Sequence, residues 1–213
     1  MPCDIAMRGA RRTLPRLCCR NAHFRQFILS LHLALSARSA KASRINMVAE
    51  KSLILDEQQV QQKIRRMAFE IYEHNFKEKN IVIAGIAGQG YVLATLLVEQ
   101  VQLISPLELT LVKVTLDKLA PSQNNVTLDC DVKTLRKKCI ILVDDVLNTG
   151  RTFAYGMKPF LDVEVKKIET AVLVNRSHTL FPIYPQYTGY ALATTIKDHV
   201  EVNLGKGSAV YLV

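Results

Sequence analysis

The fold of this chain is decided by the stretch Cys139-Ile140-Ile141-Leu142-Val143-Asp144-Asp145-Val146-Leu147-Asn148-Thr149-Gly150-Arg151-Thr152. It begins with a run of aliphatic residues and continues through two carboxylates into a loop of small and hydroxylated residues. Such a run, bounded by acidic and turn residues, is typical of a buried strand at 139–143 in a parallel sheet. Ligands of these sheets bind beyond the carboxyl ends of the strands, where this loop would lie.

On both sides of this strand, helix and strand patterns alternate along the chain. Apolar residues at helical spacing predict helices at 56–75, 92–102 and 152–161. Aliphatic and β-branched runs predict further inner strands at 81–86, 109–116, 168–174 and 190–194. A short extended segment at 53–55 precedes the first helix, and 201–204 with 209–212 would form a closing hairpin. We therefore expect an α/β fold with a doubly wound, mostly parallel five-stranded sheet.

The polar segment 117–131, which contains one proline and two asparagines, interrupts this alternation. We expect it to be an exposed excursion, or a flexible hairpin folded over the site.

The net charge of +9 is concentrated at the start of the chain. Residues 1–46 contain nine arginines and lysines and one acid, so the remainder carries only +1. This near-neutral remainder gives no global argument for a polyanion partner such as RNA, although a local basic patch is compatible with it. Three interpretations of 1–46 compete: a targeting segment, an upstream start before the real initiator Met47, and a nucleic-acid-binding arm. We favour the second, and expect a leader at 1–46 and one domain at 47–213.

Cysteine usage and hydropathy indicate the compartment. From Met47 onward the chain has only Cys130 and Cys139, nine residues apart and without nearby histidines. This spacing fits neither a zinc site nor a disulfide framework, and indicates a reducing environment. Because no apolar stretch is long enough to span a bilayer, we expect a cytoplasmic protein with no membrane partner.

The loop that comes after the two carboxylates is suited to hold the phosphate of a sugar. Backbone amides at the start of a helix converge as donors, a glycine allows close approach, and two threonine hydroxyls add further donors. The predicted phosphate-binding residues are Leu147, Asn148, Thr149, Gly150, Arg151 and Thr152.

Asp144 and Asp145 are the predicted catalytic pair. Their carboxylates can accept hydrogen bonds from two vicinal ribose hydroxyls, and can hold Mg²⁺, directly or through water, where it bridges to a pyrophosphate. A response-regulator receiver also has an acidic pair, but it needs about 100 residues after that pair. Only 68 residues follow Asp145. An acid-rich turn that caps a helix would not explain the residues Asn-Thr-Gly-Arg-Thr at 148–152.

Two motifs carry a resemblance to a known family. The aliphatic run with VDDVLNTGRT resembles the phosphoribosyl-pyrophosphate motif of type I phosphoribosyltransferases. A second string resembles the pyrimidine-operon attenuation regulators that double as uracil phosphoribosyltransferases; it comprises Val172-Leu173-Val174-Asn175-Arg176-Ser177-His178, Pro182-Ile183 and Tyr187-Thr188-Gly189. The resemblance extends from about Leu53 to the carboxyl end.

The resemblance implies a specific reaction. Ribose 5-phosphate passes from phosphoribosyl pyrophosphate to a nucleobase, such as the pyrimidine uracil, giving a nucleoside monophosphate and pyrophosphate. It also implies Mg²⁺ bound with the substrate, and a homodimer. The residues implied are a pyrophosphate loop of Ala87, Gly88, Gln89 and Gly90, a base pocket of Asn175, Arg176, Ser177 and His178, and Lys118 in the flexible loop. For His178, a direct contact with the base and a structural hydrogen bond both stay open.

The chain departs from the family pattern at positions that matter for charge. Family members usually carry Thr-Arg-Gly where Gly88-Gln89-Gly90 stands, and the missing charge-assisted contact is worth about 1.5–3 kcal/mol. Lys118 is the one cation kept in the flexible loop, and Asn175 and Ser177 replace an aspartate and a glycine. Two alternatives therefore stand beside the enzyme: an RNA-binding attenuation regulator with weak or no catalysis, and a nucleotide or phosphoribosyl-pyrophosphate sensor without RNA.

Overall fold

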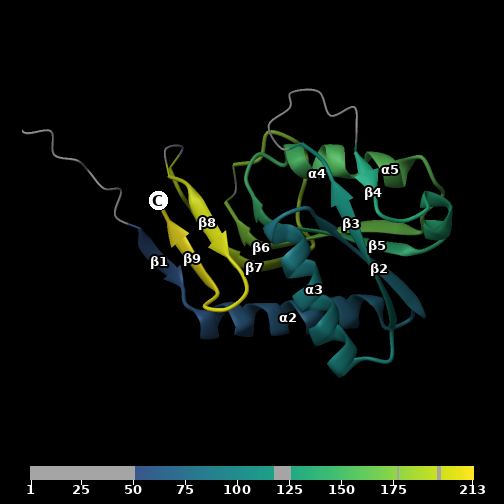
Figure 1. Cartoon of the computed structure of the whole chain (residues 1–213), viewed down its shortest axis with the longest axis horizontal. Helices are drawn as coiled ribbons and strands as arrows, with labels where there is room; N and C mark the ends of the chain where they lie inside the picture. Colours follow the sequence, from purple (N-terminus) through teal and green to yellow (C-terminus); the bar gives the residue numbers. More distant parts are fainter. Residues whose placement is uncertain (1–50, 118–125, 177, 196–197) are drawn as a thin grey trace, which may run out of the picture. The chain divides into compact units, whose positions relative to one another are not determined.

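The computed structural model describes residues 51–117, 126–176, 178–195 and 198–213 (Figure 1). The expected leader at 1–46 lies outside the described residues, as do Lys118 of the predicted flexible loop and Ser177 of the predicted base pocket. The division of the chain at Met47 therefore stays a prediction. Among the described residues, no helix is both long and apolar enough to cross a membrane.

The centre of the domain is a sheet of six strands: β2 (Asn80–Ile86), β3 (Glu108–Thr115), β4 (Thr127–Leu128), β5 (Cys139–Leu147), β6 (Lys167–Asn175) and β7 (Tyr187–Ala191). Their order is β4-β3-β2-β5-β6-β7. All pairs are parallel except β3 with β4, where the segment predicted as an excursion or hairpin folds back on β3. The prediction of a doubly wound, mostly parallel sheet of five strands is confirmed, and β4 adds a short antiparallel edge.

Helices cover both faces of this sheet (Figure 1). α2 (Glu57–Asn75) and α3 (Gln89–Ile104) pack on one face and share a buried apolar cluster with β2, β5 and β6. The other face is covered by α4 (Arg151–Gly156), α5 (Lys158–Leu161) and the 3-10 helix η1 (Val132–Leu135). Two separate apolar clusters thus fix the sheet from either side, and the ends of its strands are left for the site.

The predicted single helix at 152–161 is divided into α4 and α5 at Met157. Pro159 explains the break, because proline has no backbone N–H to donate to the carbonyl of Tyr155 and its ring crowds that turn. The chain resumes with hydrogen bonds from Phe160 N and Leu161 N to Met157 O. Met157 is thus both the C-cap of α4 and the N-cap of α5.

The last strand of the sheet lies earlier than predicted. It spans Tyr187–Ala191 rather than 190–194, with Ala171 opposite Tyr187 and Asn175 opposite Ala191. Tyr187 is fully buried, and a Cβ atom at Gly189 would lie 2.7 Å from the Leu173 carbonyl oxygen. The close approach of β7 to β6 thus requires this glycine, which the pattern of apolar residues alone did not reveal.

The central strand β5 is longer than predicted and continues from Cys139 to Leu147. Its pairing with β6 persists past Val143, with Val146 opposite Val174 and Leu147 opposite Asn175. The prediction that the strand ends before the two aspartates was therefore wrong. Cross-strand pairing of aliphatic residues extends the strand through the acidic pair and fixes its backbone.

A second, three-stranded sheet has the order β1-β9-β8, from β1 (Ser52–Leu55), β8 (Val200–Asn203) and β9 (Ala209–Leu212). The predicted extended segment and the closing hairpin are both confirmed. The hairpin turn places Gly205 and Gly207 at φ values of +128° and +74°, which L side chains rarely adopt.

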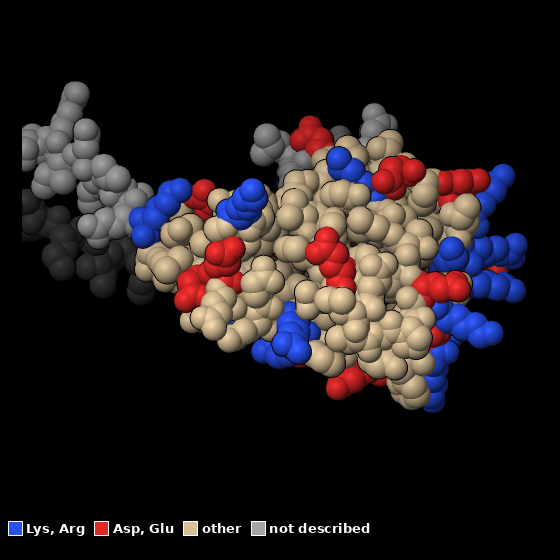
Figure 2. Space-filling view, turned by 60° about the horizontal axis from the view of Figure 1, so that its bottom comes forward, with Lys and Arg blue, Asp and Glu red and all other residues tan. Residues whose placement is uncertain are grey.

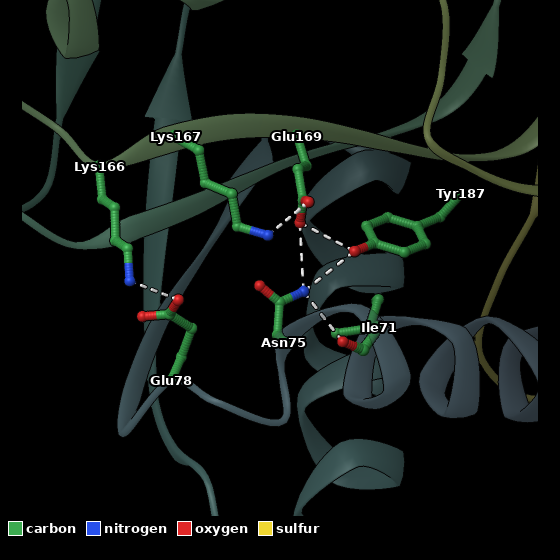
Figure 3. A network of polar contacts seen from close by, with 7 residues as sticks. All are labelled: Ile71, Asn75, Glu78, Lys166, Lys167, Glu169 and Tyr187. Carbon is green, nitrogen blue, oxygen red and sulfur yellow. Dashed lines mark hydrogen bonds and ion pairs between the residues drawn. The ribbon is translucent and has the colours of Figure 1, made fainter.

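A polar network holds the edge of the main sheet at which the strands begin (Figure 3). Asn75 Nδ2, at the end of α2, donates to Ile71 O at 2.9 Å, Tyr187 Oη at 3.0 Å and Glu169 Oε2 at 3.2 Å. Tyr187 Oη donates to Glu169 Oε2 at 2.8 Å, and Lys167 Nζ lies 2.6 Å from Glu169 Oε1. This network joins α2 to the first residues of β6 and β7.

Candidate active site

The predicted site segments meet at the edge of the main sheet where its parallel strands end. Residues 87–90 follow β2, 148–152 follow β5, and Arg176 and His178 follow β6. Because β2, β5 and β6 are neighbours in the sheet, these three loops lie next to one another. The structure therefore brings together the segments that the sequence analysis selected from distant parts of the chain.

The pyrophosphate loop and the acidic pair are in direct contact. Gly90, in the first turn of α3, is so close to β5 that a Cβ atom on it would lie 2.7 Å from Asp144 Oδ1 and 2.9 Å from Asp144 Cα. Asp144 is only 2% exposed, and its Oδ1 accepts a hydrogen bond from Asp145 N at 3.1 Å. Asp145 is half-buried and is the more accessible of the two carboxylates.

The predicted phosphate loop is held in shape by a segment that the sequence analysis did not assign to the site. Gly150 has φ +80° and caps α4, and a Cβ atom on it would lie 3.3 Å from Ile183 Cβ. Thr149 O accepts hydrogen bonds from Leu180 N at 2.8 Å and Phe181 N at 3.0 Å. The residues 180–183 therefore support the loop from outside, and no local motif in the sequence indicates that contact.

Arg151 and Thr149 show how the turn into α4 is built. Arg151 N donates to Thr149 Oγ1 at 3.4 Å, so this hydroxyl closes a local turn immediately before α4. Arg151 is exposed on the loop, and its guanidinium lies over the Phe181 ring, 6.0 Å from the ring centroid. The stacking directs this cation along the supporting segment.

Gln89, which the sequence analysis places in the pyrophosphate loop, has its side chain anchored by the protein itself. Its Oε1 accepts a hydrogen bond from Leu204 N at 3.1 Å, in the turn between β8 and β9. The loop itself is anchored by Ala87 N, which donates to Val114 O at 2.8 Å, and Gly88 has φ +101°. The carbonyl side of Gln89 is thus bound within the protein, and its amide group is the part that can face a ligand.

The predicted base pocket is organised around a buried arginine. Arg176 is 4% exposed and donates to Thr194 Oγ1 at 3.0 Å, Asp198 O at 2.7 Å and Thr195 O at 3.2 Å. The hydrogen bonds from Thr195 to the Asp198 carboxylate, among them one of 2.7 Å from the backbone amide, lower the pKa of Asp198. Arg176 therefore holds the chain that follows β7 against the end of β6.

His178 and Asn175 flank this arginine. His178 Nε2 lies 2.8 Å from Thr194 O, which is the structural hydrogen bond of the two alternatives that the sequence left open. Asn175, the last residue of β6, accepts from Leu192 N at 2.8 Å through its backbone oxygen. Thr194 thus contacts two residues of the predicted base pocket, and the sequence analysis did not select it because these partners are 16 and 18 residues away.

The oxygen donors of the site suit Mg²⁺ bound together with a phosphorylated substrate. Among the described residues, no three His, Cys, Asp or Glu side chains are grouped as a resident metal site would need. Mg²⁺ is commonly held by one or two carboxylates plus substrate phosphates, and Asp144 and Asp145 are such carboxylates. The residues present therefore fit a cation that arrives with its substrate.

Comparison with known proteins identifies the family of this chain. The phosphoribosyl transferase domain matches residues 51–204. The "Bifunctional protein PyrR" of Bacillus pumilus (strain SAFR-032) is 34% identical over 166 residues, which cover 74% of this chain and 92% of that protein. The protein of the same name from Bacillus cereus (strain B4264) is 33% identical over 164 residues, with 73% and 91% covered.

Solved structures show the same fold at lower identity. A hypoxanthine-guanine phosphoribosyltransferase from Bacillus anthracis has a TM-score of 0.58 at 18% identity, covering 68% of this chain and 84% of that one. The hypoxanthine phosphoribosyltransferase of Trypanosoma cruzi has a TM-score of 0.59 at 13% identity, covering 70% and 84%. The family match and the relatives above 30% identity agree with this fold. The chain therefore belongs to the phosphoribosyltransferase family, and it is a phosphoribosyltransferase.

Proposed function

We propose that this protein transfers ribose 5-phosphate from phosphoribosyl pyrophosphate to a pyrimidine base, with uracil as the preferred acceptor. The observation that carries the proposal is the contact of Gly90 with Asp144. It joins the loop proposed for pyrophosphate to the carboxylates proposed for ribose. A single substrate that contains both groups fits that junction.

In the proposed reaction, the bond between the anomeric carbon and pyrophosphate breaks, and the electron pair leaves with pyrophosphate. The base nitrogen forms the new bond with its lone pair, and its proton passes to solvent. Asp145 and Asp144 accept hydrogen bonds from the ribose hydroxyls, and the amides of 147–152 hold the 5-phosphate. Catalysis is by positioning and by stabilisation of the charge on the leaving group. Mg²⁺, held by Asp144 and Asp145, would neutralise part of that charge.

The choice of a pyrimidine has specific support. The string from Val172 to His178 resembles the uracil-using branch, and the relatives named PyrR are 33–34% identical to this chain. The hypoxanthine-type neighbours share the fold at 18% identity or less. We propose that the base lies between Asn175 and the segment that Arg176 and His178 hold at Thr194.

A direct assay tests this proposal. The full chain is incubated with Mg²⁺, phosphoribosyl pyrophosphate and, in separate reactions, uracil, cytosine, hypoxanthine or guanine, and each nucleoside monophosphate is measured by chromatography. We expect uridine monophosphate as the main product. The double variant Asp144→Asn with Asp145→Asn is the matched control and should neither bind phosphoribosyl pyrophosphate nor form product, while its circular dichroism is unchanged. Absence of product with every base would overturn the proposal.

RNA-dependent regulation is a second candidate function, favoured by the surface charge. Figure 2 shows lysines and arginines gathered at the end of the molecule where β5 and β6 begin. Lys137 and Lys138 directly precede β5, Lys166 directly precedes β6 and Lys167 begins it, and Lys166 N donates to Lys138 O. Of these four, Lys166 and Lys167 also form ion pairs with Glu78 and Glu169. Binding to pyrimidine-operon leader RNA should weaken steeply with salt, and Lys137→Glu with Lys138→Glu should reduce both the affinity and the salt slope. RNA affinity that the double variant leaves intact would exclude this surface.

A further inference from the structure

We propose that the β8–β9 hairpin positions the pyrophosphate loop through the side chain of Gln89. This inference rests on the proposed function and deepens it, because it names a positioning residue for the leaving group. The hairpin belongs to the small sheet β1-β9-β8, which is separate in hydrogen bonding from the sheet that carries the site. Gln89 is a direct polar link between the two.

The contact lies at the start of α3. Gln89 is the first residue of that helix, and its Oε1 accepts from Leu204 N at 3.1 Å. Leu204 is 7% exposed, and the hydrogen bond that its amide donates is partly buried. The next residue of the chain, Gly90, packs on Asp144 at the sheet edge. A shift of the hairpin turn would therefore be transmitted to the residues that face the leaving group.

The turn that supplies the donor is itself fixed. Ser208 Oγ accepts from Gly205 N at 3.1 Å and donates to Gly205 O at 2.8 Å, closing the turn on itself. Glu57 Oε1, at the start of α2, accepts from Gly207 N at 3.2 Å. These three hydrogen bonds hold the segment 204–208 at a defined place, so Leu204 N is a fixed anchor rather than a moving one.

The chemistry of the amide explains why a glutamine suits this position. A guanidinium has five donors and no acceptor, so an arginine at this position could not accept from Leu204 N. A glutamine has no positive charge, but its Oε1 is an acceptor for the Leu204 amide of the hairpin. Its amide Nε2 keeps two N–H donors that can point toward a pyrophosphate oxygen once Oε1 is anchored. The loop is thus held in shape by a hydrogen bond from the hairpin.

Binding of two different ligands separates this role from a general loss of structure. Magnesium pyrophosphate occupies only the leaving-group side, whereas uridine monophosphate occupies the ribose, phosphate and base side. We expect Ser208→Ala and Gln89→Leu each to weaken binding of magnesium pyrophosphate by about threefold to tenfold in calorimetric titration. Binding of uridine monophosphate should change by less than about twofold.

The double variant tests whether the hairpin acts through Gln89. If it does, Ser208→Ala has no further effect once Gln89→Leu is present, so the two changes are not additive. Additive losses, or unchanged pyrophosphate binding in a folded Ser208→Ala protein, would overturn the proposal. Glu57→Ala, an exposed change that loosens the same turn, replaces Ser208→Ala if that variant does not fold. Glu201→Gln, which alters the exposed ion pair with Lys51 elsewhere in the hairpin, is the matched control and should bind as the wild type does.

Hydrogen exchange tests the tether without any ligand. The Leu204 amide should exchange about threefold to tenfold faster in Gln89→Leu, and should stay protected in Gln89→Glu, which keeps an acceptor. Unchanged exchange in Gln89→Leu would show that the contact does not exist in solution and would overturn the inference. The variants could show this exchange pattern while the wild-type protein binds neither magnesium pyrophosphate nor uridine monophosphate. That result would overturn the proposed function, and with it the role of the tether in binding.

Discussion

Gly90 and Asp144 are packed so closely that a single methyl group cannot be inserted between them. Gly90→Ala is therefore expected to force β5 and α3 apart, at a cost of about 1–3 kcal/mol in the free energy of unfolding. The affinity for phosphoribosyl pyrophosphate should fall at least tenfold, because the two halves of the site separate. Denaturant unfolding and calorimetric titration measure these effects.

Gly156→Ala is the matched control for that prediction. A Cβ atom there would lie 3.5 Å from Leu142 Cδ2, an ordinary contact distance. Because alanine is the better helix former, we expect unchanged or slightly higher stability and normal substrate binding. Equal losses of stability and substrate affinity in both variants would show that the close contact at Gly90 is not the cause of the effect.

Arg176 is expected to matter for the base and not for phosphoribosyl pyrophosphate. Arg176→Met removes the three hydrogen bonds that the guanidinium donates to Thr194 Oγ1, Thr195 O and Asp198 O. This loss should lower the free energy of unfolding by about 1–3 kcal/mol. Steady-state kinetics at a temperature where the variant is folded should show a raised KM for the base and a KM for phosphoribosyl pyrophosphate within about threefold of wild type. Arg151→Met, at an exposed arginine, is the comparison for stability. A larger effect on phosphoribosyl pyrophosphate than on the base would contradict the assignment.

Removal of Mg²⁺ is expected to weaken ligand binding and to leave the stability of the unliganded protein unchanged. The described residues contain no cluster of three or more metal-binding side chains, so the unliganded chain has no evident resident site there. Excess EDTA should leave the Tm of the unliganded protein unchanged and abolish the rise in Tm that phosphoribosyl pyrophosphate produces. A lowered Tm of the unliganded protein in EDTA would reveal a structural metal.

Tyr187 is expected to make the protein sensitive to alkaline pH. Burial, with the adjacent Glu169 carboxylate, raises the pKa of the Tyr187 phenol above that in the unfolded chain. Its contribution is therefore complete below the unfolded pKa of about 10, and is lost as the pH rises toward the folded pKa. Tyr187→Phe should be less stable than wild type at pH 7 by about 0.5–1.5 kcal/mol, with a gap that narrows above about pH 10.

Urea unfolding between pH 7 and pH 11 checks this expectation. Tyr184→Phe is a suitable control, because Tyr184 is 87% exposed and should not change the pH dependence. A gap for Tyr187→Phe that stays constant over this range would mean that the phenol ionises equally in both states.

Much of the fold was predictable because it depends on local patterns. The aliphatic run of β5 and the alternation of strands and helices suffice to predict a doubly wound sheet. The errors occurred where a distant partner decides the outcome. The extension of β5 through Asp145 depends on pairing with β6, and the start of β7 at Tyr187 depends on close packing at Gly189. The division at Met157 was visible in principle, because Pro159 is a local signal.

The candidate site follows the same rule. The phosphate loop and the acidic pair form one continuous motif, so the sequence suffices to select them. The partner of Gln89 is 115 residues away, and the partners of Arg176 lie in a loop with no motif of its own. The hydrogen bonds from Leu180 N and Phe181 N to the phosphate loop could not be predicted from the sequence either, because they use backbone atoms that any residue carries.

The polar network of Asn75, Glu169 and Tyr187 lies at the opposite end of the strands from the proposed site. The residues of this network and the residues of the proposed site are therefore different, and they lie at different edges of one sheet. Gln89 and Asn175, where the chain departs from the family pattern it resembles, make no contact with that network. During evolution a protein built in this way can change what it binds, or how strongly, without first losing the stability that keeps it folded.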